Sequence, residues 1–228
     1  MNKQKTIFTG TAVAVIISLL LALVPLMSTD SKAYATDGYS TEGATGFVFT
    51  DSGITVTEGD YDGYKTEGTA LTINKAGTYI VSGKCSDGSI KIKKGTTGVT
   101  LVMNGLTLTS SDTAPVACNK STGVKIIAAA GTANSLTDSV KNNDEKYTDN
   151  KNEENAVIKC KDGSNVTIGG TGTINITANG KNGIKSGATT DTEGEASLTI
   201  QNVTLNITAD VNDGINAEAS LDILSGNI

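Results

Sequence analysis

The sequence contains no arginine, histidine or tryptophan, and each absence excludes a class of site. Without histidine there is no Ser-His-Asp triad and no His-ligated zinc site. Without arginine there is no bidentate clamp on a carboxylate, so lysine supplies all 18 basic side chains. The formal net charge of −6 argues against a nucleic-acid partner, which needs a basic face, and suits divalent cations. No catalytic residue is assigned from these patterns.

Cysteine is also scarce, with Cys85, Cys118 and Cys160 far apart in 228 residues. An odd number of widely spaced cysteines does not indicate a disulfide framework. We expect these three to be small buried residues, which is the usual environment of a free cysteine.

The N-terminus has the three parts of a secretory signal peptide. Lys3 and Lys5 precede an apolar stretch over residues 7–27, and Ala33 and Ala35 form a small-x-small cleavage pattern. We predict a signal peptide over residues 1–35 and a secreted or cell-surface protein, with a Gram-positive bacterium as the suspected source. An uncleaved membrane anchor is the alternative, because the apolar stretch is nearly long enough to span a bilayer.

The rest of the chain indicates an all-β protein. Residues 36–70 are rich in Gly, Ser, Thr and acidic residues and predict a partly ordered leader, with short strands at Phe47–Phe49 and Ile54–Val56. From Leu71 onward, short alternating runs of Thr, Val and Ile are bounded by Gly or Asp-Gly. Gly and Asn interrupt every window long enough for a helix.

An internal repeat predicts how these strands are arranged. Similar segments occupy residues 99–108 (VTLVMNGLTL), 165–176 (NVTIGGTGTINI), 197–207 (SLTIQNVTLNI) and 220–228 (SLDILSGNI), with a shorter copy at 124–127 (VKII). Each full copy has two alternating triplets around a polar corner. Successive copies start 25, 32 and 23 residues apart, except for a longer interval from Val124 to Val166 that holds a polar insertion. A period in the twenties is typical of a solenoid. We predict a right-handed parallel β-helix over residues 71–228, incomplete at its C-terminus. A β-sandwich, which also has many short strands, is the alternative.

A third strand recurs in each unit and contains the lysines of interest. The matching triplets are 116–118 (VAC), 158–160 (IKC), 184–186 (IKS) and 215–217 (INA). Their last positions are small, as a narrow core requires, and a disulfide between Cys118 and Cys160 stays open. Lys159 and Lys185 would lie at the same outward place on successive coils. They are the predicted ligand-binding residues for acidic sugars, although solubilising surface charge is the alternative.

Two acidic regions are candidates for calcium binding. Asn182 and Asp213 precede Gly-Ile at two corners, where they either form a turn or offer oxygens to Ca²⁺. The polar insertion over residues 142–155 adds Asp149, Glu153 and Glu154. It lacks the spacing of an EF-hand loop, so a solvated loop is the alternative there.

Several of these motifs together resemble the secreted carbohydrate-binding-domain proteins of clostridia and related Gram-positive bacteria. They are residues 101–106 (LVMNGL) with 110–111 (SS), 134–138 (NSLTD), 155–156 (NA), 168–172 (IGGTG), 182–186 (NGIKS) and 213–215 (DGI). The resemblance implies a right-handed parallel β-helix like that of pectate lyases, Ca²⁺ at its turns, and binding of pectic acid or cellulose. Two departures are Asn182, where the family usually has Asp, and the end of the chain within a coil.

Aromatic residues are too few for sugar binding by ring stacking alone. From Val99 onward the only one is Tyr147, so lysine contacts and bridging Ca²⁺ would carry the affinity. This favours an acidic polymer such as polygalacturonate over cellulose. The alternatives are a polysaccharide lyase with a lysine base and Ca²⁺, and a structural surface protein or adhesin. We lean towards a binding module because the absence of Arg and His argues against a lyase, although Lys can act as a base if burial or a nearby cation lowers its pKa.

Overall fold

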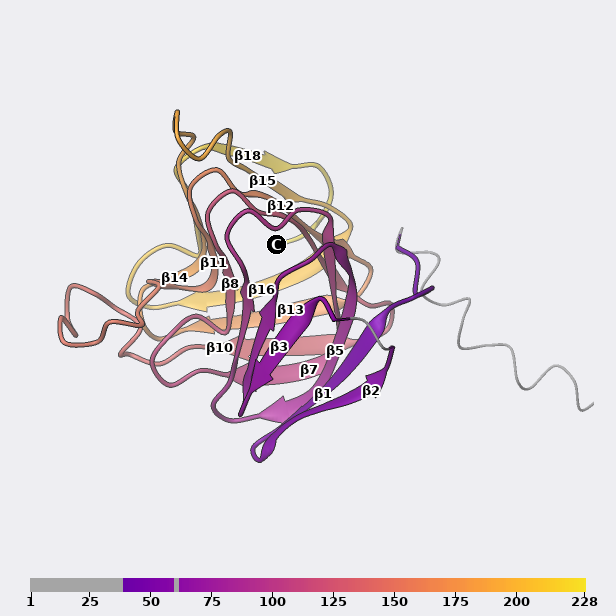
Figure 1. Cartoon of the computed structure of the whole chain (residues 1–228). Coiled ribbons are helices and arrows are strands. Elements are labelled where there is room, and N and C mark those ends of the chain that lie inside the picture. Colours follow the sequence, from indigo (N-terminus) through magenta and orange to yellow (C-terminus); the bar gives the residue numbers. More distant parts are fainter. Residues whose placement is uncertain (1–38, 60–61) are drawn as a thin grey trace, which may run out of the picture.

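The computed structural model describes residues 39–59 and 62–228, and this part of the chain is all-β without a helix. The predicted signal peptide, residues 1–35, lies outside the described residues. No described segment is a helix long and apolar enough to cross a membrane. The described strands form two sheets, one of twelve strands (the large sheet) and one of seven (the small sheet). Figure 1 shows how the strands are arranged.

The large sheet contains β1 (Thr45–Thr50), β2 (Gly53–Glu58), β5 (Gly77–Cys85), β7 (Val99–Thr109), β9 (Gly123–Ala128), β10 (Ala133–Thr137), β12 (Asn165–Gly170), β13 (Thr173–Ala178), β15 (Ser197–Ile200), β16 (Val203–Ala209), β18 (Ser220–Ile223) and β19 (Gly226–Asn227). The small sheet contains β3 (Tyr64–Glu67), β4 (Ala70–Ile73), β6 (Ser89–Ile92), β8 (Val116–Cys118), β11 (Ala156–Cys160), β14 (Asn182–Ser186) and β17 (Ile215–Ala217).

The chain advances by stacked coils, each made of one strand of the small sheet followed by strands of the large sheet. Strands β11, β12 and β13 pair in parallel with β14, β15 and β16 of the next coil. The strand path of the large sheet runs from β18 through β7 to β19. Because β18 and β19 are consecutive in the chain, this sheet bends back until it is nearly closed. Parallel pairing throughout the coils rules out the antiparallel sandwich.

Columns of buried, mostly aliphatic side chains fill the space between the sheets. Tyr79, Leu101, Ile126, Ile168 and Ile200 occupy one register position on successive coils, and all are 0% exposed. A fully buried side chain of this size stabilises a fold by about 1.5–3 kcal/mol. The alternating triplets of the repeat are therefore what holds the coils together, as the sequence pattern predicts.

The first repeat segment differs from the prediction of a corner. Strand β7 runs through Asn104 and Gly105 without interruption, and its register against β5 shifts there, as in a β-bulge. Gly105 has a φ of +75°, which glycine adopts without strain. The Asn134 Oδ1 atom accepts hydrogen bonds from the backbone N–H groups of Gly105 and Leu106, at 2.9 Å each. These bonds give the two backbone N–H groups an acceptor at the bulge, so the chain continues as one strand and does not turn at a corner.

The cysteine column of the small sheet has the predicted register. Cys118 is the register partner of Cys160 on the next coil, and Ser186 is the partner of Ala217. All three cysteines of the sequence are buried free thiols. The disulfide left open between Cys118 and Cys160 is therefore not formed in the structure.

Two antiparallel hairpins, β1–β2 and β3–β4, pack on the first coil, and the second extends to Ile73, past the predicted end of the leader at residue 70. The strands predicted at Phe47–Phe49 and Ile54–Val56 lie within β1 and β2. Phe47 and Phe49 are almost completely buried, and the Phe47 ring meets Tyr64 edge-on with centroids 4.8 Å apart. Described residues of the predicted leader thus cover one end of the core.

Candidate functional site

The outer face of the small sheet has a column of lysines at one register position. Lys159 and Lys185 are direct partners on β11 and β14, so the prediction that they share one outward place is confirmed. Ala117 precedes them in the column, and Lys91 precedes Ala117. Adjacent parallel strands lie about 4.8 Å apart. Successive ammonium groups are therefore spaced along the coil axis rather than along a strand.

The two central lysines differ in their partners. Lys185 pairs with Glu218 at 2.9 Å, whereas the half-buried Lys159 ammonium has no hydrogen-bond or ion-pair partner among the described residues. Burial lowers the pKa of Lys159, and the neighbouring positive charge of Lys185 lowers it further. The carboxylate of a ligand bound next to this pair would relieve that repulsion.

The corner that follows the small sheet carries further lysines. Lys94 pairs with Glu193 at 2.7 Å, Lys120 with Asp162 at 3.1 Å and Lys161 with Glu154 at 2.8 Å. A shallow cavity of about 390 Å³ opens at this corner beside Lys93 and Lys94. Lys93 has no ion pair in the described part of the chain.

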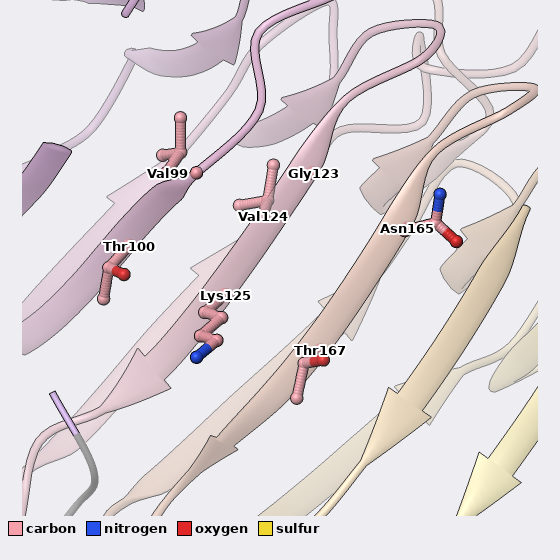
Figure 2. A pocket seen from close by; sticks show the side chains of 8 residues that line it. Val99, Thr100, Gly123, Val124, Lys125, Asn165 and Thr167 are labelled. Carbon is pink, nitrogen blue, oxygen red and sulfur yellow. The ribbon is translucent and has the colours of Figure 1, made fainter. Parts of the chain in front are cut away.

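A separate groove of about 370 Å³ lies on the large sheet, and Figure 2 shows the side chains that line it. Thr100, Lys125 and Thr167 occupy one outward column on β7, β9 and β12. Gly98 and Gly123 have no side chains to fill the hollow, and Lys125 is exposed without an ion pair among the described residues. The groove therefore offers hydroxyls and one free ammonium.

We group the lysines of the small sheet's outer face, of the corner and of the groove under one name, the lysine band. It consists of Lys91, Lys93, Lys94, Lys120, Lys125, Lys159, Lys161 and Lys185. The band belongs to a protein whose net charge is negative. Four of the eight lysines are paired with acidic side chains. The other four, which have no ion pair among the described residues, are Lys91, Lys93, Lys125 and Lys159, and their charges can attract anionic groups of a ligand.

The corner residues predicted to bind calcium are brought together, but as hydrogen-bond partners. Asn182 is 1% exposed, and its Nδ2 atom donates to the Asn155 carbonyl at 2.8 Å. Its Oδ1 atom accepts from Asn212 Nδ2 at 2.9 Å and from the Asp213 amide at 3.4 Å. Both ends of the Asn182 amide are thus already used within the corner, which fits the turn interpretation.

The predicted calcium ligands of the insertion do not join that corner. Asp149 is exposed, Glu153 is half-buried, and Glu154 pairs with Lys161. Within the described ranges, no group of three or more acidic, histidine or cysteine side chains is close enough to hold a metal ion. The five predicted ligands therefore do not fit one shared Ca²⁺ site, and calcium binding stays a prediction.

Sequence analysis missed a buried polar cluster, which we call the amide network: Asp138, Asn142, Asn143 and Asn182. Asp138 Oδ1 accepts from the Asn179 and Gly180 amides at 2.7 and 3.1 Å, and its Oδ2 accepts from Asn142 Nδ2 at 2.9 Å. Burial raises the pKa of Asp138, while these hydrogen bonds favour its charged form and oppose the rise. One feature of the sequence indicated this cluster, which is the acidic residue Asp138 directly after the alternating residues of β10.

The model of the family described as carbohydrate-binding domain-containing proteins matches residues 67–228, well over half of the chain. The chain belongs to this family. A carbohydrate-binding domain-containing protein of Acetivibrio thermocellus is 36% identical over 124 residues, which are 54% of this chain and 42% of that protein. The chain thus matches less than half the length of this curated relative. The family resemblance drawn from the motifs, including a clostridial relative, is confirmed at this level.

A solved structure shares the fold of this carbohydrate-binding domain. It is titled as the polysaccharide lyase-like protein from C. thermocellum, gadolinium derivative. The match has a TM-score of 0.53 and 22% identity, and covers 81% of this chain and all of that one. At this identity the likeness concerns the fold alone.

Proposed function

We propose that this carbohydrate-binding domain binds acidic polysaccharide outside the cell through the lysine band. The observation that carries the proposal is the register of Lys159 and Lys185, which places two like charges side by side with Lys159 unpartnered. A polymer of uronic acids lying along the coil axis would present one carboxylate after another to this column. Polygalacturonate therefore suits the band better than cellulose, which has no charge.

The proposal includes the class of the fold and the location of the protein. We interpret the stacked coils as a right-handed parallel β-helix, because crossovers between parallel strands of one sheet are right-handed in nearly all proteins. Export by the signal peptide of residues 1–35 would place the band at the cell surface or in the medium, where plant cell-wall polymers occur. Calcium, as proposed from the acidic residues, would act by bridging carboxylates of the polymer and the protein.

A polysaccharide lyase is the second candidate, favoured by one observation. A lyase needs a neutral base to remove a proton next to the substrate carboxylate, and the lowered pKa of Lys159 brings its amine closer to that state. In the described structure, Lys185 is the nearest cation in the column that could offset the substrate charge. A structural surface protein or adhesin would need neither residue.

One experiment separates these functions. The protein is incubated with polygalacturonate, with calcium or with chelator, and both co-sedimentation and absorbance from unsaturated product are measured. We expect binding without product, and at least a tenfold loss of affinity in Lys159→Ala and Lys185→Ala, which remove adjacent charges. Lys84→Ala is the matched control, because Lys84 is exposed on the large sheet outside the band.

The other outcomes assign the alternatives. Product that disappears in Lys159→Ala would make the protein a lyase. If the protein neither binds the polymer nor forms product, the structural surface protein becomes the favoured function. An unchanged melting temperature in millimolar calcium would remove Ca²⁺ from the proposal, since a ligand of the folded state must raise it.

A further inference from the structure

The connection between β10 and β11 is much longer than the equivalent connections in later coils. It spans residues 138–155, whereas residues 179–181 join β13 to β14. Figure 1 shows this segment projecting from the stacked coils between β10 and β11. In a repeat protein, an insertion confined to one unit commonly forms part of a binding surface.

The insertion is held in one conformation by buried amides. Asn142 Oδ1 accepts from the Glu154 and Asn155 amides at 2.6 and 3.0 Å, and its Nδ2 donates to the Ala156 carbonyl at 2.9 Å. Asn143 Nδ2 donates to the Gly180 carbonyl at 2.8 Å, and Asn143 is 1% exposed. A ligand would therefore meet a preorganised loop rather than one that must first be ordered.

An open cavity of about 450 Å³ lies in this loop. Its walls include Asp112, Lys141, Lys146, Tyr147, Asp149 and Asn150. Asn150 connects two parts of the cavity wall, because its Nδ2 donates to the Asp112 carbonyl at 2.6 Å and to the Lys141 carbonyl at 2.8 Å. The volume is in the range of small-molecule sites.

The cavity contains the one aromatic residue of the chain after Val99. Tyr147 is 38% exposed, and its backbone is fixed by a hydrogen bond from its N–H to the Asn143 carbonyl at 2.9 Å. An aromatic ring offers an apolar face, against which the C–H face of a sugar ring can pack. Lys141, Lys146 and Asp149 have side chains without ion pairs among the described residues, so they can pair with hydroxyls.

We propose that this cavity is a second carbohydrate site, which binds a neutral sugar unit with its ring against Tyr147. A neutral sugar suits it because the two lysines and the two aspartates of the wall balance each other, so the lining has no net charge that would select a carboxylate. The site rests on the proposed function only in that both bind carbohydrate. It lies in the corner that precedes the small sheet, whereas the lysine band lies on that sheet, at the corner that follows it and in the groove.

The test uses the whole chain and neutral tetrasaccharides of glucose, xylose and mannose as probes. Binding is measured by calorimetry and by saturation transfer from the protein to the sugar. We expect saturable binding of at least one probe and a loss on the order of tenfold in Tyr147→Ala. Tyr147→Phe should keep the affinity within a few-fold, because it keeps the ring. Val140→Ala is the control, because Val140 is an exposed apolar residue of the same loop that is not among the residues lining the cavity.

The result also separates this site from the lysine band. Lys159→Ala should weaken polygalacturonate binding and leave tetrasaccharide binding unchanged. If no probe binds at millimolar concentration, or if Tyr147→Ala binds as well as the wild type, the proposal of a second site is wrong, regardless of whether polygalacturonate binds. If polygalacturonate fails to bind while a probe binds through Tyr147, the result contradicts the proposed function of the lysine band and supports the second site.

Discussion

The two corners that flank the small sheet are held by different forces. The amide network on one side is buried, and each of the Asp138, Asn142 and Asn182 side chains has partners at both ends. On the other side, the ion pairs of Lys94 and Lys120 are open to solvent at the lysine, with the side chain of Lys94 at 62% exposure and that of Lys120 at 43%. The Lys161–Glu154 pair of the band is more buried. Breaking a buried hydrogen bond costs about 1–3 kcal/mol, whereas an exposed ion pair contributes roughly 0–1 kcal/mol. The first corner therefore maintains the structure, and the second can exchange its partners for a ligand at little cost.

The strongest test of this difference is Asn142→Ala. It removes the partner of Asp138 Oδ2, of the Ala156 carbonyl and of the Glu154 and Asn155 amides. We expect the free energy of unfolding to fall by about 2–4 kcal/mol, measured by urea denaturation. Asn152→Ala, which breaks one exposed hydrogen bond of the same loop, should change it by less than about 0.5 kcal/mol. Equal losses would show that burial of the amides does not set their importance.

Asp138→Asn sharpens the comparison within the amide network. The new side chain can still accept from the Asn179 and Gly180 amides, but its NH₂ group would face the Nδ2 donor of Asn142. Asn142 cannot turn to accommodate it, because its Oδ1 is already bound to two amides. We expect a loss of about 1–3 kcal/mol in the same denaturation assay. A variant as stable as the wild type would mean that the network can rearrange.

Glu193→Gln tests the other corner through its pH dependence. A hydrogen bond from Lys94, and a second from Ser121, lower the pKa of Glu193. A lowered carboxyl pKa adds stability above the unfolded value of about 4.3, and this is lost as the pH falls through the folded value. We expect a slightly lower melting temperature for the variant at pH 7, and no difference from the wild type in strong acid.

The control for that variant is Glu195→Gln, an exposed residue of the same loop. It should melt like the wild type at both pH values. A difference for Glu193→Gln that persists in strong acid would contradict the ion-pair explanation.

Lys159→Met should have the smallest effect on stability, and the opposite sign. Burial, and then the charge of Lys185, lower the pKa of Lys159, so the folded state binds this proton less tightly than the unfolded state does. The cost is present below the folded value and is relieved as the pH rises towards the unfolded value of about 10.4. We expect a gain of less than about 1 kcal/mol at pH 7 that shrinks by pH 10, together with weaker polygalacturonate binding.

The exposed Lys125→Met is the matched control, with no expected change in stability. If Lys159→Met loses stability at pH 7, the lysine is a structural residue and not a binding one.

The sequence predicts the features that repeat from coil to coil. Alternation and spacing indicated the strands, the small column at Cys118 and Cys160, and the shared register of Lys159 and Lys185. What it did not predict depends on contacts between distant segments. The Glu193–Lys94 pair joins residues 99 positions apart. A polar loop that folds around buried amides has the same kind of sequence as a solvated loop, so the amide network could not be predicted. The bulge at Gly105 was predicted as a corner, because its support by Asn134 comes from the next coil.

The buried cysteine column has a consequence for redox chemistry. Cys118 and Cys160 are register partners, and their mutual hydrogen bond and burial raise the pKa of Cys118 well above its usual value. Only a thiolate attacks an oxidant or an alkylating reagent at a useful rate, and here Cys118 stays protonated while both thiols are buried. The pair is therefore kinetically protected from oxidants while the coils stay stacked. The rate at which a thiol reagent labels this pair reports how often the two coils separate.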